Sequence, residues 1–464
     1  MAEPEVESVA GPGTARLSLS GWGRAPVAAM TARRPERMRE VAAALAAAGP
    51  GGVIARGMGR SYGDAALNHG GDAILTGRLD RMLEFDAGTG ELVAEAGVTI
   101  DDLLDVFLPR GWIAPVAPGT AFVTLGGALA NDVHGKNHDQ VGSFAEHVRW
   151  FDLLTADGAV RRVTPESEPA LFAATAGGIG LTGIVLRLAL ALQRIAAPAV
   201  QLREERMGSL DDFLSAFAAR ARAATYSVGW IDALARGARL GRGILETAEP
   251  APAGATVAGG RRGALAVPFD LPGFVLNPLS VAAFNELYFR RVPASGRERI
   301  VGLRRFLFPL DALRDWNRLY GKRGFRQFQC VLPDIEAATG LRALLETVSQ
   351  SRAASFLAVI KTLGGDGRGC LSFAMRGVTL ALDFPNRPDA PDLLHRLERI
   401  VLDHGGRLYL AKDSALSPEG FAAMYSRLPE LRRVLAEVDP QGRFRSDMAR
   451  RLRIREDVPM DGRA

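Results

Sequence analysis

Short apolar runs separated by Asp/Gly turns alternate with single amphipathic stretches in the first part of the chain, up to about residue 194. Apolar residues spaced three and four apart predict helices, and short alternating or continuous apolar runs predict strands. Strands interspersed with single helices indicate an α+β fold. We predict helices over 35–48, 100–111 and 169–175, and strands over 52–56, 73–76, 82–86, 92–97, 147–155, 160–163 and 184–192.

Beyond Gln193 the pattern changes to longer strands and amphipathic helices, such as a helix predicted over 210–220. Residues 250–263 are rich in Pro, Gly and Ala, and this composition predicts a mobile stretch. An apolar segment punctuated by prolines follows it. We interpret the region near 248–300 as a mobile flap that covers a site or touches a membrane, with a simple linker as the alternative.

Composition limits the class of protein. The 464 residues exceed the usual size of one hydrophobic core and predict two domains. Hydrophobic residues make up 47% and charged residues 23%, as in an ordinary soluble globular protein. The net charge of +5 is interpreted as too small and too dispersed for nucleic acid binding, although it suits an anionic substrate or a membrane surface.

The cysteine count and the N-terminus bear on compartment. Only Cys330 and Cys370 are present, so we expect neither a disulfide framework nor a CxxC metal or redox site. The N-terminus is acidic, and no run of about 18 apolar residues occurs. We therefore expect a cytoplasmic protein without a signal peptide or a transmembrane helix, and with peripheral membrane contact as an open alternative.

Three glycine-rich segments carry the strongest functional signal. They occupy 55–64, 117–144 and 175–183, each beside an apolar run, and they also contain Ser, Thr, Asn and His. Successive backbone amides near glycines form anion-binding concavities, so three such loops predict one extended, partly anionic cofactor. One such loop alone would more simply be a tight turn.

The third segment contains a GxGxxG pattern at Gly178, Gly180 and Gly183. A dinucleotide-binding Rossmann unit needs a strand before this pattern and a helix after it. Here the predicted order is a helix at 169–175 and then a strand from Ile184. We therefore reject a doubly wound nucleotide-binding fold.

Further patterns, in order along the chain, resemble one flavoprotein family. The chain resembles vanillyl-alcohol-oxidase/PCMH-type flavoproteins, and more narrowly the decaprenylphosphoryl-β-D-ribose 2-oxidases, the flavoprotein subunits of the 2-epimerase of arabinan biosynthesis. The His-Gly-Lys-Asn-His and Ala-Lys-Asp-Ser patterns are the specific ones, because glycine loops alone indicate only the superfamily. The matching segments are 57–64 (GMGRSYGD), 132–138 (DVHGKNH), 153–158 (LLTADG), 175–178 (TAGG), 406–414 (GRLYLAKDS) and 439–452 (DP…SDMARRL).

The resemblance implies a two-domain PCMH-type fold in which FAD binds between two α+β subdomains. It implies an FAD-binding domain over 20–194, a substrate domain over 195–405, and a C-terminal segment over 406–460 that returns to the FAD domain. Many relatives attach FAD through a histidine in a Gly-His-Ser pattern. This chain has Arg60 at that position, which implies non-covalent FAD, with His69 as a remote alternative anchor.

The resemblance also assigns residues to the cofactor. Lys412 is the strongest catalytic candidate, because it would place positive charge at the flavin and the substrate hydroxyl. His134 would contact the ring or assist with a proton, although a structural histidine is nearly as plausible, and Tyr62 would line the flavin. The full set assigned to FAD is Arg56, Gly57, Met58, Gly59, Arg60, Ser61, Tyr62, Pro118, Gly119, Thr120, Thr124, Gly126, Gly127, Asn131, Asp132, His134, Gly135, Asn137, Gly142, Ser143, Gly178, Gly180, Gly183, Ile184, Tyr409 and Lys412.

Four residues are candidates for substrate binding. Gln327 and Gln329 alternate across Phe328 on a predicted strand, so they should point the same way and could bind sugar or phosphate. Lys361 is a candidate partner for a substrate phosphate, and Asp383 is assigned to the same pocket. Some members of the family carry a cysteine shortly before the Asp-Phe-Pro pattern where this chain has Ala381, which places the pocket shape in doubt.

The implied reaction is oxidation of the 2-hydroxyl of a polyprenyl-phosphoryl-β-D-ribofuranose to the 2-keto sugar. An NAD(P)H-dependent keto-sugar reductase is the implied partner, and a quinone is a candidate electron acceptor. An oxidase of a soluble sugar, alditol or aldonolactone is the alternative enzyme. A flavin-binding scaffold without catalytic activity is the alternative outside enzymes.

Overall fold

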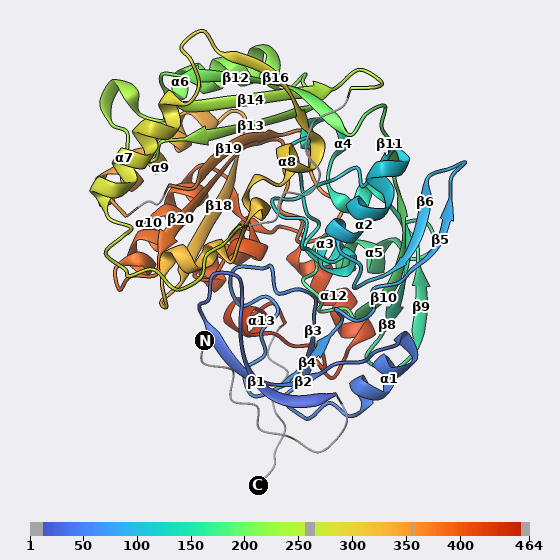
Figure 1. The fold of residues 1–464 in the computed structure, drawn as a ribbon. Coiled ribbons are helices and arrows are strands. Elements are labelled where there is room, and N and C mark those ends of the chain that lie inside the picture. The colour runs from blue at the N-terminus through green and yellow to red at the C-terminus, as the bar shows by residue number, and fades with distance from the viewer. Residues whose placement is uncertain (1–12, 256–264, 354–355, 456–464) are drawn as a thin grey trace.

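The computed structural model describes residues 13–255, 265–353 and 356–455. Two parts lie side by side in Figure 1. The part at the lower right is formed by the first strands and helices together with the C-terminal tail. The part at the upper left is built on one large sheet.

The first part contains two larger sheets. In the four-stranded sheet, ordered β1-β2-β4-β3, β2 and β3 run parallel to β4 and β1 runs antiparallel to β2. The five-stranded sheet, ordered β5-β6-β10-β8-β9, is antiparallel throughout. The strands are β1 (Thr14–Ser20), β2 (Val27–Arg33), β3 (Val53–Arg56), β4 (Asp72–Leu75), β5 (Met82–Asp86), β6 (Glu91–Glu95), β8 (Val148–Leu154), β9 (Val160–Val163) and β10 (Ile184–Ala191). A further pair joins β7 (Trp112–Ile113) to β11 (Gln193–Arg194).

Short helices cover these sheets. A capping box explains why α2 begins where it does. The Thr99 side chain accepts from the Asp102 N–H, and the Asp102 side chain accepts from the Thr99 N–H, so two N–H groups at the helix start are satisfied. The same helix buries an apolar face against the core. The helices are α1 (Met38–Ala46), α2 (Ile100–Phe107), α3 (Leu125–Ala130), α4 (His138–Val141) and α5 (Pro169–Thr175).

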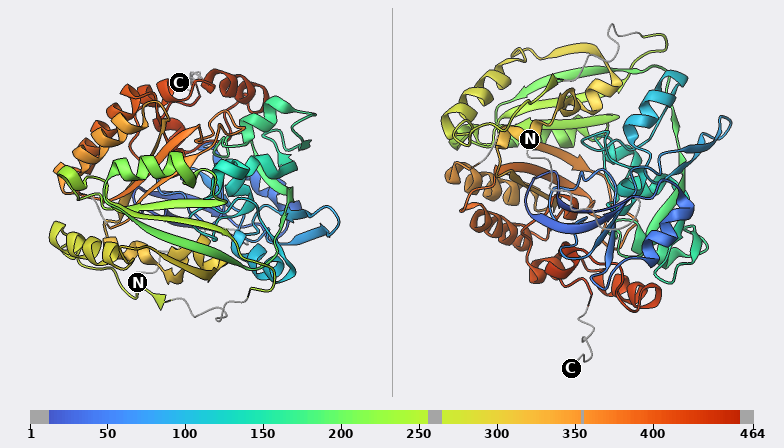
Figure 2. Two further views of the ribbon diagram at one scale, coloured as in Figure 1. Left: turned by 90° about the horizontal axis from the view of Figure 1, so that it is seen from above. Right: turned by 60° about the horizontal axis from the view of Figure 1, so that its bottom comes forward.

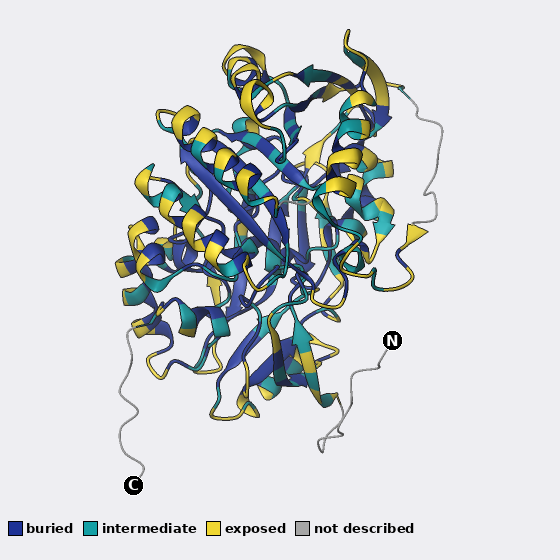
Figure 3. Cartoon of the chain, turned by 90° about the vertical axis from the view of Figure 1, so that its left-hand side faces the viewer, coloured by how far each residue is buried: buried dark blue, intermediate teal, exposed yellow. Residues whose placement is uncertain are grey.

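The second part is an eight-stranded antiparallel sheet in the order β16-β12-β14-β13-β19-β20-β18-β21. Figure 3 shows buried strands behind helices whose outer faces are exposed. Helices α9 and α10 contact β18, and α6 contacts β12. The strands are β12 (Ala199–Met207), β13 (Tyr226–Ile231), β14 (Gly243–Pro250), β16 (Arg297–Gly302), β18 (Phe325–Pro333), β19 (Ala358–Leu363), β20 (Gly377–Pro385) and β21 (Arg407–Leu408). The helices are α6 (Leu210–Ala216), α7 (Pro278–Arg290), α8 (Leu303–Leu307), α9 (Ala337–Ser351) and α10 (Ala390–Asp403).

The C-terminal tail returns to the first part, as the red segment in Figures 1 and 2 shows. The Val53 N–H donates to the Arg443 carbonyl at 2.9 Å, and the Arg445 N–H donates to the Val53 carbonyl at 3.0 Å. Helix α12 packs on α5. The tail therefore completes the first part beside β3. Its helices are α11 (Pro418–Met424), α12 (Leu428–Val438) and α13 (Asp447–Arg451).

The elements predicted from the hydrophobic pattern are present in the first part. The helix predicted over 169–175 is α5, and the predicted hairpin is β8 and β9. The GxGxxG pattern lies between helix α5 and strand β10, so the rejection of a Rossmann unit is confirmed. The helix predicted over 210–220 is shorter, because α6 ends at Ala216 and passes into a π-helical turn.

Much of the region 248–300, predicted to be a mobile flap, consists of regular elements in the described structure, and its role as a flap stays a prediction. Pro250 is the last residue of β14 and pairs with Val200, and Ala251 is buried. Helix α7 and the edge strand β16 occupy much of the remainder. A proline at the end of a strand does not interrupt the ladder, so the start of the Pro-rich stretch can belong to β14. Residues 256–264 of the predicted flap lie outside the described residues.

No helix in the described part of the chain has both the length and the hydropathy needed to cross a bilayer.

Candidate active site

A cavity of about 570 Å³ lies between the two parts of the molecule. One wall is formed by the glycine-rich loops of the first part. The opposite wall is formed by β18, β19 and β20, together with the loop that carries Lys412. The three glycine-rich segments, which are separate in the sequence, therefore meet at one site.

The first loop offers unpaired backbone donors to the cavity. Met58, Gly59, Arg60 and Ser61 all line it. Within the described residues, none of their four N–H groups donates to a protein acceptor. The Nε of Arg60 is likewise buried without a partner, and its guanidinium lies over the Trp22 ring at 4.5 Å. Consecutive free N–H groups beside a half-buried guanidinium form a site suited to an anion such as a diphosphate.

The second segment contributes small residues and the start of α3 to the cavity wall. Gly126 and Gly127 lie in the first turn of α3, where their N–H groups already donate to the Ala96 carbonyl and the Thr124 hydroxyl. These two amides are therefore not free for a ligand. At Gly119 an added β-carbon would meet no atom within 4 Å, because this part of the loop borders the open cavity.

The third segment brings Gly180 and Gly183 to the cavity. Gly183 has φ +154°, and an added β-carbon there would lie 2.5 Å from the Leu154 carbonyl oxygen. Glycine is therefore required at this position by backbone conformation and by close packing against β8.

Lys412 and Tyr62 form the centre of the reactive wall. The Lys412 ammonium lies 3.6 Å from the centroid of the Tyr62 ring, a cation–π contact. The Tyr62 N–H donates to the Ala411 carbonyl at 2.8 Å, which joins the two loops. Burial lowers the pKa of Lys412, because the charged amine loses its hydration. This lysine therefore exchanges a proton more readily than a surface lysine does.

Asp383 lies behind this wall and does not line the cavity. It is fully buried and accepts hydrogen bonds from the Gln327 amide and from the Tyr320 hydroxyl, the latter at 3.1 Å. Burial raises the pKa of this carboxyl group. Its charge in turn raises the pKa of Lys412, against the effect of burial. Asp383 therefore acts on the site through Gln327 and through its field at Lys412.

His134 faces the cavity next to Gln329. Its Nε2 lies 3.1 Å from the Gln329 amide nitrogen, and its Nδ1 is buried without a partner in the described structure. Burial, and then the charge of Lys361, hold the pKa of His134 well below its ordinary value. The imidazole is therefore neutral, with one nitrogen left for a bound molecule.

Lys361 lines the same cavity from β19 and donates to the Gly135 carbonyl at 3.4 Å. Burial lowers its pKa to about 7, and nearby Lys136 contributes in the same direction. Gln327 and Gln329 both line the cavity from β18, as the alternation along a strand predicts. Ala381 lies on the adjacent strand β20 and also borders the cavity.

The sequence of this chain is similar to those of known FAD-dependent oxidases. A family model described as "FAD binding domain" matches residues 31–164, and one described as "D-arabinono-1,4-lactone oxidase" matches residues 381–452. The decaprenylphosphoryl-β-D-ribose oxidase of Mycolicibacterium smegmatis is 38% identical over 454 residues, which are 95% of this chain and 98% of that protein. This chain belongs to the decaprenylphosphoryl-β-D-ribose oxidase family. It is an FAD-dependent oxidoreductase.

Two further relatives show how far the similarity extends. An uncharacterised protein of Streptomyces coelicolor is 38% identical over 368 residues, which are 76% of this chain and 100% of that protein. The L-gulonolactone oxidase of Bos taurus is 30% identical over 157 residues, about a third of each chain. This chain thus resembles the bovine lactone oxidase over only part of its length.

The cavity of this oxidase fits FAD on the evidence of its own atoms. The free amides at 58–61 with Arg60 suit the diphosphate, and the small residues of the second and third segments leave room for an extended molecule. The orphaned Oδ1 of Asn131 and Nδ1 of His134 are polar atoms that a bound cofactor would satisfy. Most residues assigned to FAD from the sequence line this cavity.

Eight of the residues assigned to FAD do not line the cavity. Asp132 accepts from the Ala145 N–H and the Ser372 hydroxyl, and the Arg56 guanidinium donates to the Ser20 and Ala66 carbonyls. Such contacts hold the loops in shape instead of touching a ligand, and they orient the polar groups into the protein. The eight are Arg56, Asp132, Gly135, Asn137, Gly142, Ser143, Gly178 and Ile184.

Sequence reasoning also missed part of the cavity wall. The segment around β17 (Leu313–Arg314) and the 3₁₀ turn after it lies over the glycine loops. Asp311 in this segment accepts from the Ala121 N–H at 2.7 Å. No glycine cluster or polar pattern marks this region, so only tertiary contact reveals it. The lining residues concerned are Leu310, Asp311, Leu313, Arg314, Asp315 and Trp316.

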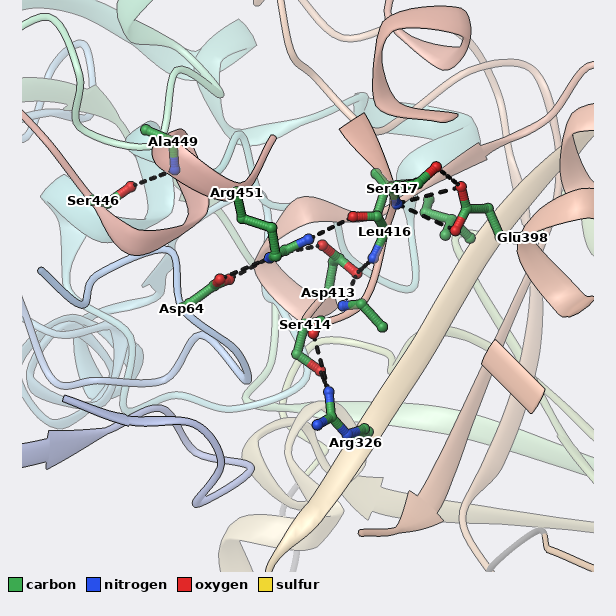
Figure 4. A network of polar contacts seen from close by, with 12 residues as sticks. Asp64, Arg326, Glu398, Asp413, Ser414, Leu416, Ser417, Ser446, Ala449 and Arg451 are labelled. Atoms are coloured by element: carbon green, nitrogen blue, oxygen red, sulfur yellow. Dashed lines mark hydrogen bonds and ion pairs between the residues drawn. The ribbon is translucent and has the colours of Figure 1, made fainter. Parts of the chain in front are cut away.

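A polar network holds the two reactive loops from behind (Figure 4). Arg451 of α13 donates to both carboxylate oxygens of Asp64 at 2.8 Å, and to Asp413 at 2.8 Å. Asp64 follows Tyr62 by two residues, and Asp413 follows Lys412 directly. An added β-carbon at Gly63 would lie 1.9 Å from the Asp413 carbonyl oxygen, so the loops are in close contact.

Proposed function

We propose that this protein oxidises the 2-hydroxyl of a polyprenyl-phosphoryl-β-D-ribofuranose to the 2-keto sugar. The observation that carries the proposal is the pairing of Lys412 with Tyr62 on the wall of an otherwise largely apolar cavity, with Lys361 on the same side. The near full-length similarity to the decaprenylphosphoryl-β-D-ribose oxidase of Mycolicibacterium smegmatis supports the choice of substrate.

Oxidation of an alcohol requires removal of the hydroxyl proton and a hydride. FAD, when bound, supplies the hydride acceptor. Lys412 is proposed to take the hydroxyl proton at its Nζ, because burial makes its neutral form accessible near neutral pH. The Asp383 charge limits this shift, so that the amine can still hold the proton once it has been transferred.

Other residues of the chain would bind and orient the sugar phosphate. Lys361 is proposed to bind the phosphate, because a buried ammonium gains strongly from a new anionic partner. Gln327 and Gln329 present amides to the cavity and are proposed to orient sugar hydroxyls, Gln327 being held by Asp383. Ala381 leaves space that a larger residue would fill, and we propose that it shapes the sugar subsite.

Two partners complete the proposal. The keto sugar requires hydride return at the same carbon to become the arabinose epimer, and we propose that a separate NAD(P)H-dependent reductase carries out that step. We propose a quinone as the electron acceptor and peripheral contact with the membrane, since a polyprenyl substrate resides there. The apolar character of the cavity supports an apolar acceptor.

An aldonolactone oxidase is the second candidate function. The match of residues 381–452 to the D-arabinono-1,4-lactone oxidase model favours it. It has less support, because the lactone oxidase of Bos taurus covers only a third of the chain.

Anaerobic titration of the holoenzyme separates these activities. We expect polyprenyl-phosphoryl ribose to bleach the visible absorbance of the flavin, and ribose 5-phosphate and aldonolactones to leave the flavin oxidised. Reduction by aldonolactone but not by the lipid-linked sugar would replace the proposal with the second candidate. Reduction by none of them would exclude both.

A further inference from the structure

An apolar face lies on the outside of the second part, along α7 and the segment before it. We define the docking face as residues 265–291. Its large apolar side chains Leu265, Phe274, Leu279 and Leu287 are 75%, 77%, 83% and 74% exposed. Along α7 the exposed residues recur at three- and four-residue spacing, whereas Val281 and Asn285 are buried on the opposite side. The left view of Figure 2 shows α7 and β15 (Leu265–Ala266) along the same edge of the molecule.

The docking face itself is balanced in charge, with Arg290 and Arg291 against Asp270 and Glu286, and the segment that follows it in the sequence is basic. Residues 265–323 contain ten Lys and Arg against five Asp and Glu, an excess of five. The whole chain has the same excess, with 57 against 52. Part of this excess is neutralised by acidic residues elsewhere in the chain, because Arg297 and Arg299 pair with Glu204.

Part of this basic set touches the face directly. Arg318 donates to the Val267 and Pro268 carbonyls at 3.1 and 2.9 Å. The exposed Lys322 and Arg323 follow in the same loop. Large apolar side chains beside basic ones match a surface with an apolar interior and anionic head groups.

The docking face is continuous with the cavity. Strand β15, which begins the face, pairs with β17, whose residues line the cavity. Aromatic rings form a second connection inward from α7. Their centroids are 5.3 Å apart for Phe284 and Phe356, 6.1 Å for Phe356 and Tyr320, 4.3 Å for Tyr320 and Phe325, and 5.4 Å for Phe325 and Tyr62. An apolar path thus leads from the exposed helix to the reactive wall.

We infer that the docking face inserts into the surface of an anionic lipid bilayer and places the cavity mouth against it. The exposed apolar side chains, the adjacent exposed Lys322 and Arg323, and the continuity with the cavity carry this inference. It deepens the proposed function in one respect only, namely that a lipid-linked substrate would enter from the bilayer. Leu279 and Leu287 would lie at head-group depth, with Lys322 and Arg323 facing lipid phosphates.

Vesicle co-sedimentation of the holoenzyme tests the inference. We expect binding to vesicles of phosphatidylcholine mixed with phosphatidylglycerol, weaker binding to phosphatidylcholine alone, and loss of affinity as salt is raised. Replacement of Leu279 and Leu287 together by Asp should lower the affinity at least about tenfold, because two inserted side chains become charged. Lys322→Glu with Arg323→Glu should lower affinity only for the anionic vesicles.

A matched control is available outside the face. Ile335, in the turn between β18 and α9, is 88% exposed, so Ile335→Asp introduces one Asp at an exposed apolar site and is the control for the single variants Leu279→Asp and Leu287→Asp. Flavin content and the thermal midpoint of each variant report on folding. The inference is overturned if the wild type does not bind anionic vesicles, or if Ile335→Asp weakens binding as much as the single α7 variants do. Retention of vesicle binding by a protein that does not oxidise the lipid-linked sugar would overturn only the proposed function.

The docking face could instead bind a protein partner such as the reductase. In that case the enzyme should not co-sediment with vesicles, and the α7 variant should fail to bind the purified partner. That result would also overturn the inference.

Discussion

The guanidinium of Arg451 donates a hydrogen bond of 2.8 Å to the carboxylate of Asp413, the residue that follows Lys412. The same guanidinium holds Asp64, close to Tyr62, through two bonds of 2.8 Å. One side chain of the C-terminal tail thus positions both loops of the reactive wall. Both carboxylates are buried, so the pairing is protected from solvent screening.

Arg451→Lys should slow flavin reduction. Lysine keeps the charge but cannot bind two carboxylates with a planar fork, so the loops should shift relative to each other. A displacement of about 1 Å can cost about 10²-fold in rate. Stopped-flow measurement of flavin reduction by substrate gives the effect, and flavin content shows whether the variant folds.

Arg455 provides the matched control. It pairs with the buried Asp439 at 2.7 Å in the same tail, away from the Tyr62 and Lys412 loops. We expect Arg455→Lys to lower the thermal midpoint as Arg451→Lys does, while the reduction rate stays near that of the wild type. Equal slowing in both variants would show that Arg451 acts only through stability.

Lys412→Met should remove most substrate-dependent reduction while FAD stays bound. A positioned proton acceptor typically contributes about 10²–10⁴-fold in rate, whereas cofactor contacts are spread over three loops. Single-turnover kinetics and the flavin spectrum of the purified variant measure the two quantities separately. A rate of reduction like that of the wild type would exclude Lys412 as the proton acceptor.

The rate of flavin reduction should rise with pH, and this rising limb of the pH–rate profile should lie well below the ordinary lysine pKa. The reason is that burial lowers the pKa of Lys412 and that its neutral form is the base. Asp383 acts in the opposite direction, since its negative charge favours the ammonium. Asp383→Asn removes that charge and should move the limb to lower pH. An unchanged limb, or one moved upward, would contradict the assignment.

Lys361→Gln should raise KM for the phosphorylated substrate about tenfold, because a hydrogen bond to a charged group is lost, and change kcat much less. Steady-state kinetics with the lipid-linked sugar separates the two constants. A fall in kcat at constant KM would place Lys361 in the chemical step instead of in phosphate binding.

Acid or heat precipitation should release unmodified FAD from the protein, because Arg60 stands where a linking histidine would be. His69 does not line the cavity and accepts weakly from the Ala29 N–H at 3.4 Å, so it is badly placed as an anchor. Flavin fluorescence that stays with the polypeptide on a denaturing gel would contradict the prediction and direct attention to His134, which does line the cavity.

Local pattern was sufficient for some of these features and insufficient for others. Alternation along a strand placed Gln327 and Gln329 on one side, and both line the cavity. The meeting of Tyr62 with Lys412 followed only from family resemblance, because no local periodicity relates segments so far apart. Asp132 has a polar side chain within the same segment as Asn131, yet it bonds to Ser372 inside the protein. Such a difference depends on tertiary neighbours.

The missed wall around Asp311 and Trp316 has the same cause. Its residues form two short 3₁₀ helices with the two-residue strand β17 between them, and they show neither strong periodicity nor a glycine cluster. The segment acquires its role by lying across loops from the beginning of the chain, where Asp311 accepts from the Ala121 N–H. Position relative to a distant loop leaves no local signal in sequence.

The return of the tail to β3 determines the order in which the two parts can complete folding during synthesis. The backbone bonds from Val53 to Arg443 and Arg445, and the hold of Arg451 on Asp64, cannot form until nearly the whole chain has left the ribosome. The eight-stranded sheet, encoded in between, can assemble earlier, since domains generally fold as units in the order of synthesis. The cofactor-binding half is thus begun first and closed last, so its flavin site is complete only after the tail has been synthesised.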